Sequence, residues 1–313
     1  MYDQSCLFEK MKIEEGFAEY TYQLSPYNAE LLNINLYLAQ AILLEVSTSP
    51  KPGLVTKTGN GSHKDMSIMT FMMSSAVLSK AFYELQAIGL SHDGRPEELM
   101  KKVRAYGIGV EKELLNVTKG VNTQRGILFA GGVLSAAAGY ASSKNLPSTS
   151  LIDVVKAMTK GIVAKELRNL QGSGRTYGEK LYEKYGITGI RGEIENGFPS
   201  VINYGLPALR EAFAKQANIN DALIHALLNL MAVVEDSNVL WRSDWQTAQQ
   251  TKRVAKEILM AGSVFTEAGR YLLQEACHDF EKLNISPGGS ADLLSITIAL
   301  YLLENKEFPC AIL

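Results

Sequence analysis

Features that mark several protein classes are scarce in this sequence of 313 residues. Its three cysteines, Cys6, Cys277 and Cys310, lie far apart and form no CxxC pair, which argues against a disulfide framework and fits a reducing compartment. The 31 lysines and arginines are balanced by 33 aspartates and glutamates. A protein that binds nucleic acid through its phosphates carries an excess of positive charge instead.

Long hydrophobic runs are missing too. No stretch reaches the roughly 18 apolar residues of a membrane-spanning helix, and the first ten residues, MYDQSCLFEK, are too polar for a signal peptide. Apolar residues make up 46% and charged residues 20% of the chain, as in globular rather than disordered proteins. We therefore expect a globular protein of the cytoplasm.

Alternation of apolar and polar residues, which indicates half-buried strands, is missing apart from short pieces such as 197–203. Long stretches rich in Ala, Leu and Met predict helices instead. These stretches are 33–46, 66–88, 127–141, 151–170, 219–234, 254–261, 271–283 and 291–303. The sequence therefore predicts an all-α fold of about ten helices, arranged as a single catalytic domain over residues 1–313.

Glycine and proline gather between the predicted helices, in the segments 49–63, 119–126, 171–178, 186–199 and 284–292. Such connections are longer than the loops of roughly 2–8 residues in simple helical bundles. Long ordered loops on a rigid scaffold often carry binding chemistry. We expect these Gly-rich loops to form the active site at one end of the bundle.

Short catalytic motifs with a known mechanism are also absent. The sequence contains no HExxH, GxSxG, Rossmann GxGxxG or Walker loop, and no zinc-type spacing of Cys and His. What remains is a set of acids, arginines and Gly-rich helix starts. That combination suits a phosphorylated, metal-bound substrate.

The first candidate is Glu45, which shares a predicted helical face with Ala41 and Ile42. A carboxylate on an apolar face needs a partner, and Lys51 and Lys57 follow closely. Either the ion pair only holds the loop, or Glu45 takes part in chemistry.

The segment 62–65 has two interpretations. Ser62 and Asp65 fit a capping box before a helix that starts at Met66. Alternatively, His63 and Asp65 bind a metal or a phosphate, since His63 is the histidine that lies in a Gly-rich loop.

Two further loops carry an arginine. Arg125 follows Asn122 and Thr123 at a predicted helix start, where free N–H groups attract anions, although Asn122 or Thr123 as a plain N-cap explains the pattern equally. Arg191 and Glu193 lie between glycines, in a loop that is either solvated or part of a site.

The segment 235–238 follows a long apolar run. If the helix ends there, Glu235 and Asp236 lie at the negative end of its dipole, and a cation would stabilise them. Alternatively, Asp236 or Ser237 caps the next helix. Arg242 either binds a phosphate or pairs with Asp236.

The segment 286–292 is the best phosphate-binding candidate. Gly288 and Gly289 allow the backbone to approach a ligand closely. We expect Ser290 to cap the last helix, whose N–H groups would then bind an anion.

As a set, these segments resemble the triphosphoribosyl-dephospho-CoA synthase family. The matching segments occur in the family's order and read EVSTSPKPGLV (45–55), GSHKDM (61–66), GVNTQRG (120–126), KELR (165–168), GITGIRGEIENGFP (186–199), EDSNV (235–239) and NISPGGSADLL (284–294). The resemblance covers about residues 36–303, so we expect residues 1–30 to be a variable N-terminal extension.

The resemblance implies an all-α fold and a transfer reaction. ATP and 3′-dephospho-CoA would give 2′-(5″-triphosphoribosyl)-3′-dephospho-CoA and adenine, with Mg²⁺ as the cofactor. The product is the precursor of the prosthetic group of citrate lyase or malonate decarboxylase, and a separate transferase would load it onto an acyl carrier protein subunit. A homodimer is one possible assembly. No nucleic-acid or membrane partner is expected.

The resemblance also suggests roles for the candidate residues. We expect Glu193 to be the general base, with Glu45 next in line, and Arg191 and His63 to be catalytic. The metal ligands would be Asp65, Asp236 and Asp292. The residues expected to bind substrate are Lys51, Asn122, Thr123, Arg125, Asn238, Arg242, Ser286, Gly288, Gly289 and Ser290.

The sequence departs from the family pattern in three places. Gln124 stands where the family commonly has His, and Ser237 replaces Thr in a motif that usually reads GDTN, where Glu235 replaces Gly. A Gly pair commonly follows the arginine of that motif, but here Ser243 and Asp244 follow Arg242. The third change puts the nucleotide or acceptor pocket in question.

Two other functions compete with this interpretation. A helical Mg²⁺-dependent hydrolase that cleaves an N-glycosidic or phosphate bond would need the same acids, with water as the acceptor. A non-catalytic helical protein would bind nucleotide without turnover. Acceptor dependence separates the three, because the synthase should release adenine faster when dephospho-CoA is present.

Overall fold

The computed structural model describes residues 28–168 and 176–310, and within these ranges every regular element is helical. The only strand-like pairing there is an isolated bridge between Thr56 and Gly59. The predicted all-α fold is therefore confirmed. Most of the expected N-terminal extension and part of the segment 171–178 lie outside the described residues.

The α-helices are α2 (Ala29–Leu32), α3 (Ile34–Ser47), α4 (Ile68–Leu90), α5 (Pro96–Val117), α6 (Arg125–Ser143), α7 (Leu151–Thr159), α8 (Tyr177–Tyr185), α9 (Gly189–Glu195), α10 (Leu206–Ala214), α11 (Ile219–Met231), α12 (Ser237–Arg242), α13 (Trp245–Met260), α14 (Glu267–Lys282) and α15 (Gly288–Asn305). Two 3₁₀ turns are η1 (Ser148–Ser150) and η4 (Ser263–Phe265), and two one-turn π-helices are η2 (Ala164–Arg168) and η3 (Val201–Gly205).

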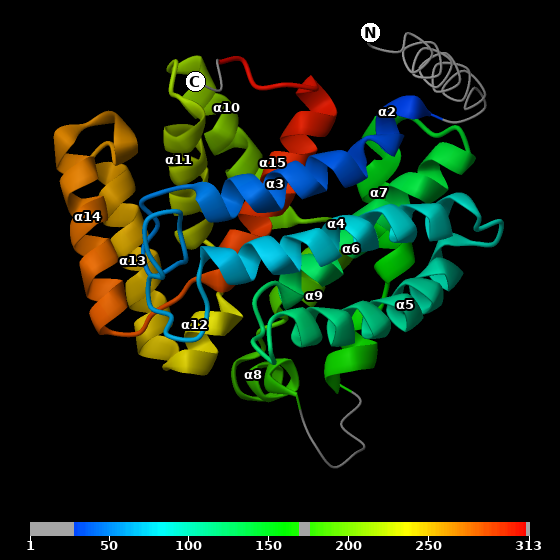
Figure 1. Ribbon diagram of the computed structural model, residues 1–313, viewed down its shortest axis with the longest axis horizontal. Coiled ribbons are helices and arrows are strands. Elements are labelled where there is room, and N and C mark those ends of the chain that lie inside the picture. Colours follow the sequence, from blue (N-terminus) through cyan, green and yellow to red (C-terminus); the bar gives the residue numbers. More distant parts are fainter. Residues whose placement is uncertain (1–27, 169–175, 311–313) are drawn as a thin grey trace, which may run out of the picture.

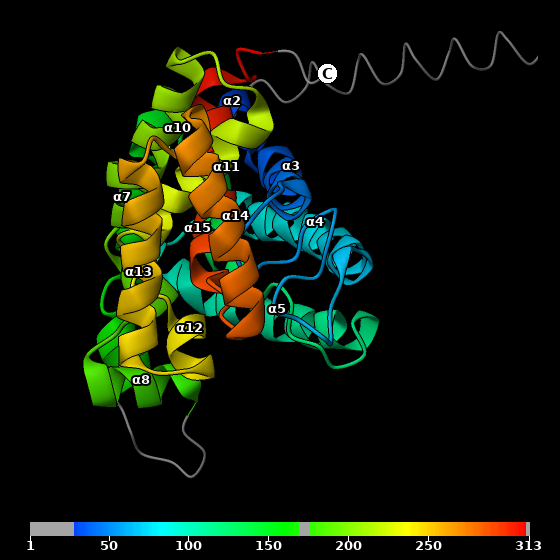
Figure 2. The ribbon, with the colours of Figure 1, turned by 90° about the vertical axis from the view of Figure 1, so that its left-hand side faces the viewer.

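The helices form two groups that cross each other. In Figure 1, α3, α4, α5 and α6 run across the molecule, whereas α10, α11, α13 and α14 stand upright beside them. Figure 2, turned by 90°, shows α13 and α14 side by side on one face, with α3, α4 and α5 away from them. α15 lies between the groups and contacts α3, α6, α10 and α11.

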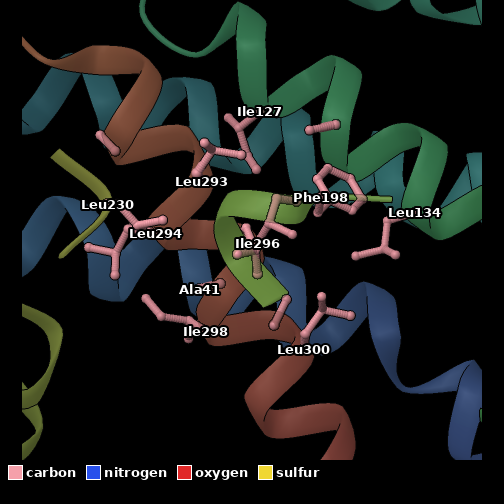
Figure 3. Close-up of a cluster of buried hydrophobic side chains, with 14 of the residues drawn as sticks. Ala41, Ile127, Leu134, Phe198, Leu230, Leu293, Leu294, Ile296, Ile298 and Leu300 are labelled. Carbon is pink, nitrogen blue, oxygen red and sulfur yellow. The ribbon is translucent and has the colours of Figure 1, made fainter. Parts of the chain in front are cut away.

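α15 is the centre of the core because it is apolar on all sides. Its residues from Leu293 to Leu303 are all buried. Figure 3 shows Leu293, Ile296 and Leu300 of α15 packed among Ala41 of α3 and Leu134 of α6. A helix without a polar face has to be covered by neighbours all round, and this requirement places it between the two groups.

α6 is long and apolar enough to span a membrane, but 83% of the relevant window is buried inside the protein. Its many alanines and glycines let α4 approach closely. A Cβ on Gly139 would lie 2.1 Å from the backbone oxygen of Gln86, and a Cβ on Gly89 would lie 2.0 Å from the backbone oxygen of Ala136. α6 is therefore a core helix whose composition follows from its close packing.

One predicted helix was too long, and several helices were missed. The helix predicted over 151–170 ends at Thr159, and Gly161 with a positive φ of 78° precedes the π-helix η2. The ambiguous piece at 197–203 leads into the π-helix η3 and forms no strand. The 22-residue helix α5 and the helices α8 and α10 were missed. So were α2 and α9, which are under two turns long and show no clear apolar period.

The close crossing of α4 and α6 can be tested with matched glycine substitutions. We expect Gly139→Ala to destabilise the protein by about 1–3 kcal/mol or more, because the new methyl group meets backbone rather than a flexible side chain. Gly109→Ala on the exposed face of α5, where nothing lies within 4 Å, should instead stabilise by about 0.5–1 kcal/mol. Urea unfolding followed by circular dichroism measures both; equal effects would contradict the packing described here.

Candidate active site

A pocket of about 1010 Å³ opens between α5, α6, α8, α9, α12 and the start of α15. These elements lie together in the lower half of Figure 1. The volume is at the upper end of the range of about 300–1,000 Å³ for small-molecule sites, as a site for two substrates requires. The predicted site residues that line it are Asn122, Thr123, Arg125, Arg191, Glu193, Asp236, Asn238, Gly288, Gly289 and Asp292.

Glu193 enters the pocket from α9. Its carboxylate accepts hydrogen bonds from the backbone N–H and the hydroxyl of Ser200, at 3.2 and 2.6 Å. Burial raises the pKa of Glu193 above its usual value, and the two bonds from Ser200 only partly oppose this rise. A carboxylate with a raised pKa at the wall of a large pocket is suited to accept a proton.

The chain at Glu193 is helical, and not the loop that we expected. Glu195 therefore lies on another side of α9 and accepts hydrogen bonds from the N–H groups of Gly161 and Val163, at 2.6 and 3.1 Å. Those bonds hold the chain just before η2. Thus Glu193 lines the pocket, whereas Glu195 supports the neighbouring backbone.

Asp236 joins the N-termini of two helices. It is the N-cap of α12, and its buried carboxylate accepts hydrogen bonds from the N–H groups of Asn238 and Val239. It also accepts hydrogen bonds from the N–H groups of Gly289 and Ser290, at 3.3 and 2.8 Å, and from the Ser290 hydroxyl, at 3.0 Å. Burial raises the pKa of Asp236, and these bonds oppose the rise.

Two expectations about this region need correction. α11 ends at Met231, so Asp236 does not lie at the negative end of a helix, and the alternative that it caps the next helix is the observed one. α15 begins at Gly288, so Ser290 lies in its first turn and does not cap it. The first N–H groups of α15 are already bound within the protein, which leaves fewer donors for a phosphate.

The carboxylate of Asp292 likewise binds at the N-terminus of a helix, in this case α6. Its carboxylate accepts a hydrogen bond from the N–H of Ile127 and lies against Gly126, where a Cβ would be 1.9 Å from Oδ2. Burial, together with the nearby charges of Glu45 and Asp236, raises the pKa of Asp292 well above its usual value. Neither Asn122 nor Thr123 caps α6, whose N-cap is Gln124.

The residues near the start of α6 differ in what they can offer a ligand. Arg125 pairs with Glu111 at 2.5 Å. Among the described residues, the buried hydroxyl oxygen of Thr123, a residue of the pocket lining, has no hydrogen-bond partner. The buried side chain of Gln124 accepts a hydrogen bond from the Ser74 hydroxyl.

Glu45 and Lys51 form a buried ion pair that does not line the pocket. Lys51 Nζ donates to the Glu45 carboxylate and, at 2.5 Å, to its backbone oxygen. Burial lowers the pKa of Lys51 more than the Glu45 charge raises it. Lys57, the other expected partner, is exposed. The pair connects the end of α3 to the segment 49–63.

His63, Asp65, Arg242 and Ser286 form a second cluster outside the pocket lining. His63 Nε2 lies 2.8 Å from the Ser286 hydroxyl, and its Nδ1 lies 3.8 Å from Asp65. Arg242 Nη1 is within 3.5 Å of the imidazole ring. Burial and the Arg242 charge lower the pKa of His63, which favours the neutral ring.

This cluster shows that two expected contacts are not made. Arg242 does not bind Asp236 but donates to the backbone oxygen of Ser62 and, at 3.1 Å, to Asn284. The side chain of Asp65 is 60% exposed and apart from Asp236 and Asp292. The capping box predicted at Ser62 and Asp65 is wrong, because the helix begins at Ile68, where Ser67 and Thr70 form the box.

The fit of these acids to Mg²⁺ is limited. Within residues 28–168 and 176–310, no three His, Cys, Asp or Glu side chains are grouped to hold a metal ion. The carboxylate of Asp236 already has five donors. Mg²⁺ in phosphate-handling sites often uses one or two carboxylates together with substrate phosphates. Asp292, which is buried and has one protein donor, fits that arrangement.

Several pocket residues were missed by the sequence analysis. Arg104 of α5 and Lys180 of α8 line the pocket, and Trp245 stacks on Tyr185 with ring centroids 5.5 Å apart. Arg104 is one of many charged residues on the amphipathic helix α5, and nothing in its local sequence distinguishes it. Glu166, which binds both Arg104 and Arg191, lies in the segment KELR, a motif that we quoted without assigning it a role.

Comparison with known proteins adds independent information. The family model described as ATP:dephospho-CoA triphosphoribosyl transferase matches residues 32–309. A probable 2-(5''-triphosphoribosyl)-3'-dephosphocoenzyme-A synthase of Malonomonas rubra is 42% identical over 95% of this chain and 94% of its own length. Proteins given as 2-(5''-triphosphoribosyl)-3'-dephosphocoenzyme-A synthase from Pectobacterium atrosepticum and Klebsiella pneumoniae are 39% and 35% identical, over 87% and 88% of this chain and 89% and 91% of their own lengths. No solved structure matches the chain.

The buried ion pair can be tested by removing one or both charges. Glu45→Gln should destabilise the protein by about 3 kcal/mol, because Lys51 is then buried without its partner. The double variant Glu45→Leu/Lys51→Met should recover most of that loss. Glu113→Gln, which breaks an exposed pair with Lys80, should change stability by less than about 1 kcal/mol. Urea unfolding measures all three, and a harmless Glu45→Gln would leave Glu45 free for a catalytic role.

Proposed function

Because the chain belongs to the ATP:dephospho-CoA triphosphoribosyl transferase family, we propose that it transfers the triphosphoribosyl group of ATP to 3′-dephospho-CoA. The products are 2′-(5″-triphosphoribosyl)-3′-dephospho-CoA and adenine. The relatives give no support to the alternative of a hydrolase. The structural observation that best supports the proposal is Glu193, a half-buried carboxylate with a raised pKa in a pocket that also presents Arg104 and Arg191.

The reaction needs one proton acceptor and two binding regions. The 2′-hydroxyl oxygen of dephospho-CoA attacks C1″ of the ATP ribose, the bond from C1″ to adenine breaks, and adenine leaves with the electron pair and takes up a proton from solvent, while the proton accepted by the base is afterwards released to solvent. Glu193 takes the proton of the attacking hydroxyl. Inversion by direct displacement is the simpler path, since the family's product is understood to be α-linked while ATP is β-linked.

Positive charge builds up on the ribose in the transition state, as in glycoside hydrolysis. Carboxylates near the sugar stabilise such charge, and Asp236 and Asp292 line the pocket together with Glu193. Thr123 and Asn238 supply polar groups for the substrates at the same wall. Arg125, which is paired with Glu111, adds charge near the start of α6.

Mg²⁺ is the proposed cofactor. Asp292 would hold it, because the Asp236 carboxylate already accepts five hydrogen bonds, and the ion would supply positive charge to the phosphate oxygens nearest Asp292. Asp65, one of the predicted ligands, is not assigned to this ion, because its side chain is 60% exposed and does not line the pocket.

The residues that follow Arg242, where the family commonly has a Gly pair, also affect the pocket. Asp244 caps α13 through the N–H of Thr247, and Trp245 lines the pocket against Tyr185. An aromatic pair at this position can stack on a nucleobase, which both substrates carry.

The cellular context follows from the same family. We propose that the protein acts in the cytoplasm and passes its product to a separate transferase that acts on an acyl carrier protein subunit. The homodimer stays a prediction.

The proposed reaction is tested by acceptor-dependent release of adenine. With ATP and Mg²⁺ alone, we expect little adenine. Adding 3′-dephospho-CoA should raise its release at least about tenfold and give a new species with the mass of the adduct. Excess chelator should abolish the release. Adenine release that is equally fast without the acceptor would favour a hydrolase, and ATP binding without any turnover would favour a binding protein.

The base is tested by the pH dependence of the rate. Glu193 must be ionised to accept a proton, so activity should fall as the pH falls through its raised pKa. Glu193→Gln should lower kcat by about 10²-fold or more with ATP binding retained. Ser200→Ala removes a bond that favours the ionised form, so its acidic limb should move to higher pH. A near-normal kcat for Glu193→Gln would assign the base to another residue.

A further inference from the structure

Arg104, Glu166 and Arg191 form an ion-pair network at the pocket wall, which we call the arginine clamp. We propose that the two guanidinium groups of this clamp bind the triphosphate of ATP. This inference rests on the proposed function, and it names the part of the pocket that receives the most highly charged group of the two substrates.

The geometry of the clamp aims positive charge at the pocket. One Glu166 carboxylate oxygen accepts a hydrogen bond from Nη2 of Arg104, and the other accepts one from Nε of Arg191 at 2.8 Å. Both arginines line the pocket, whereas Glu166 does not. The carboxylate thus lies behind the two guanidinium groups and fixes their positions.

Within the residues that the structure describes, the clamp keeps a net charge of +1 and most of its N–H donors. Each guanidinium has five N–H donors, and Glu166 uses one from each. Arg104 is further held with its Cζ 4.3 Å from the centroid of the Phe129 ring. Preorganised guanidinium groups suit the bidentate binding of phosphate oxygens. The amine of Lys180, which also lines the pocket, adds a positive charge.

The helix N-termini at the pocket are already bound to carboxylates of the protein. The Asp236 carboxylate accepts hydrogen bonds from the N–H groups of Gly289 and Ser290 in the first turn of α15. The Asp292 carboxylate accepts one from the N–H of Ile127 in the first turn of α6. A triphosphate at the start of α15 would meet the buried Asp236 carboxylate instead of free N–H groups. The arginine clamp is therefore the better site, in place of the segment 286–292.

The clamp also lies at a suitable position relative to the proposed base. Arg191 and Glu193 both belong to the short helix α9, so their separation is fixed by the helix. The triphosphate and the reacting C1″ belong to the same ribose. A substrate held by Arg191 at its phosphates can therefore present its ribose to the acceptor hydroxyl near Glu193.

The test measures binding of inorganic tripolyphosphate and ATP by calorimetry. Arg104→Gln and Arg191→Gln should each raise the dissociation constants of tripolyphosphate and of ATP at least about tenfold. The dissociation constant of adenosine should change less than about twofold. Arg104→Lys keeps the charge but loses the planar fork, so it should fall between wild type and Arg104→Gln. The control is Arg210→Gln on α10, which breaks an exposed pair with Glu304 and should bind like wild type. Circular dichroism confirms that each variant is folded.

Unchanged affinity for tripolyphosphate in folded Arg104→Gln and Arg191→Gln would overturn the proposal. A loss in Gly289→Val, whose Cβ would meet the Asp236 carboxylate at 3.2 Å, with none in Arg104→Gln would return the triphosphate to α15. The binding test needs no turnover. Wild-type protein that binds tripolyphosphate through the clamp but releases no adenine would refute the proposed reaction and leave the clamp standing.

Discussion

The bonds of Asp236 connect the core of this protein to its pocket. A single buried carboxylate caps α12 and also binds the first N–H groups of α15, the central apolar helix. It therefore fixes the position at which α15 begins relative to the pocket wall. A buried carboxylate is costly without partners, and the five donors around Asp236 are what make this position tolerable. Asp292, one turn further along α15, repeats the arrangement at α6.

The pocket carries charges of both signs, contributed by several helices. Asp236 and Asp292 lie where α12, α15 and α6 meet, and Arg104, Arg191 and Lys180 come from α5, α9 and α8. Arg125 of α6 and Glu193 of α9 line it as well. A substrate with a phosphate chain and a sugar that becomes positively charged can find groups of both signs in such a pocket. The arrangement also explains why helix N-termini, which commonly bind phosphate, are used here to hold carboxylates of the protein itself.

Sequence reasoning was most successful for the long apolar helices and least successful where contacts between distant segments determine the structure. The apolar stretches of α3, α11 and α15 predicted helices because they are too long for typical strands and rich in helix-forming residues. The charged helix α5 was missed. The pairing of Glu45 with Lys51 was anticipated because both lie near one helix end. By contrast, Arg104 reaches Glu166 across 62 positions, and the partners of Arg242 come from loops far away in the chain. No local pattern encodes such contacts, which explains why the roles of Asp236 and Ser290 were partly misjudged.

The glycine contacts between α4 and α6 have a consequence for how the molecule moves. Gly89 and Gly139 bring the two backbones together with no side chain between them, so the helices have little freedom to slide or separate. Two nucleotides must nevertheless enter and leave the pocket. On the opposite wall, α8 packs mainly against α12 and η2 within the part of the chain that the structure describes, and its Tyr185 stacks on Trp245 of α13. Gating by one lightly packed helix against a rigid crossing would let the pocket open without disturbing the core.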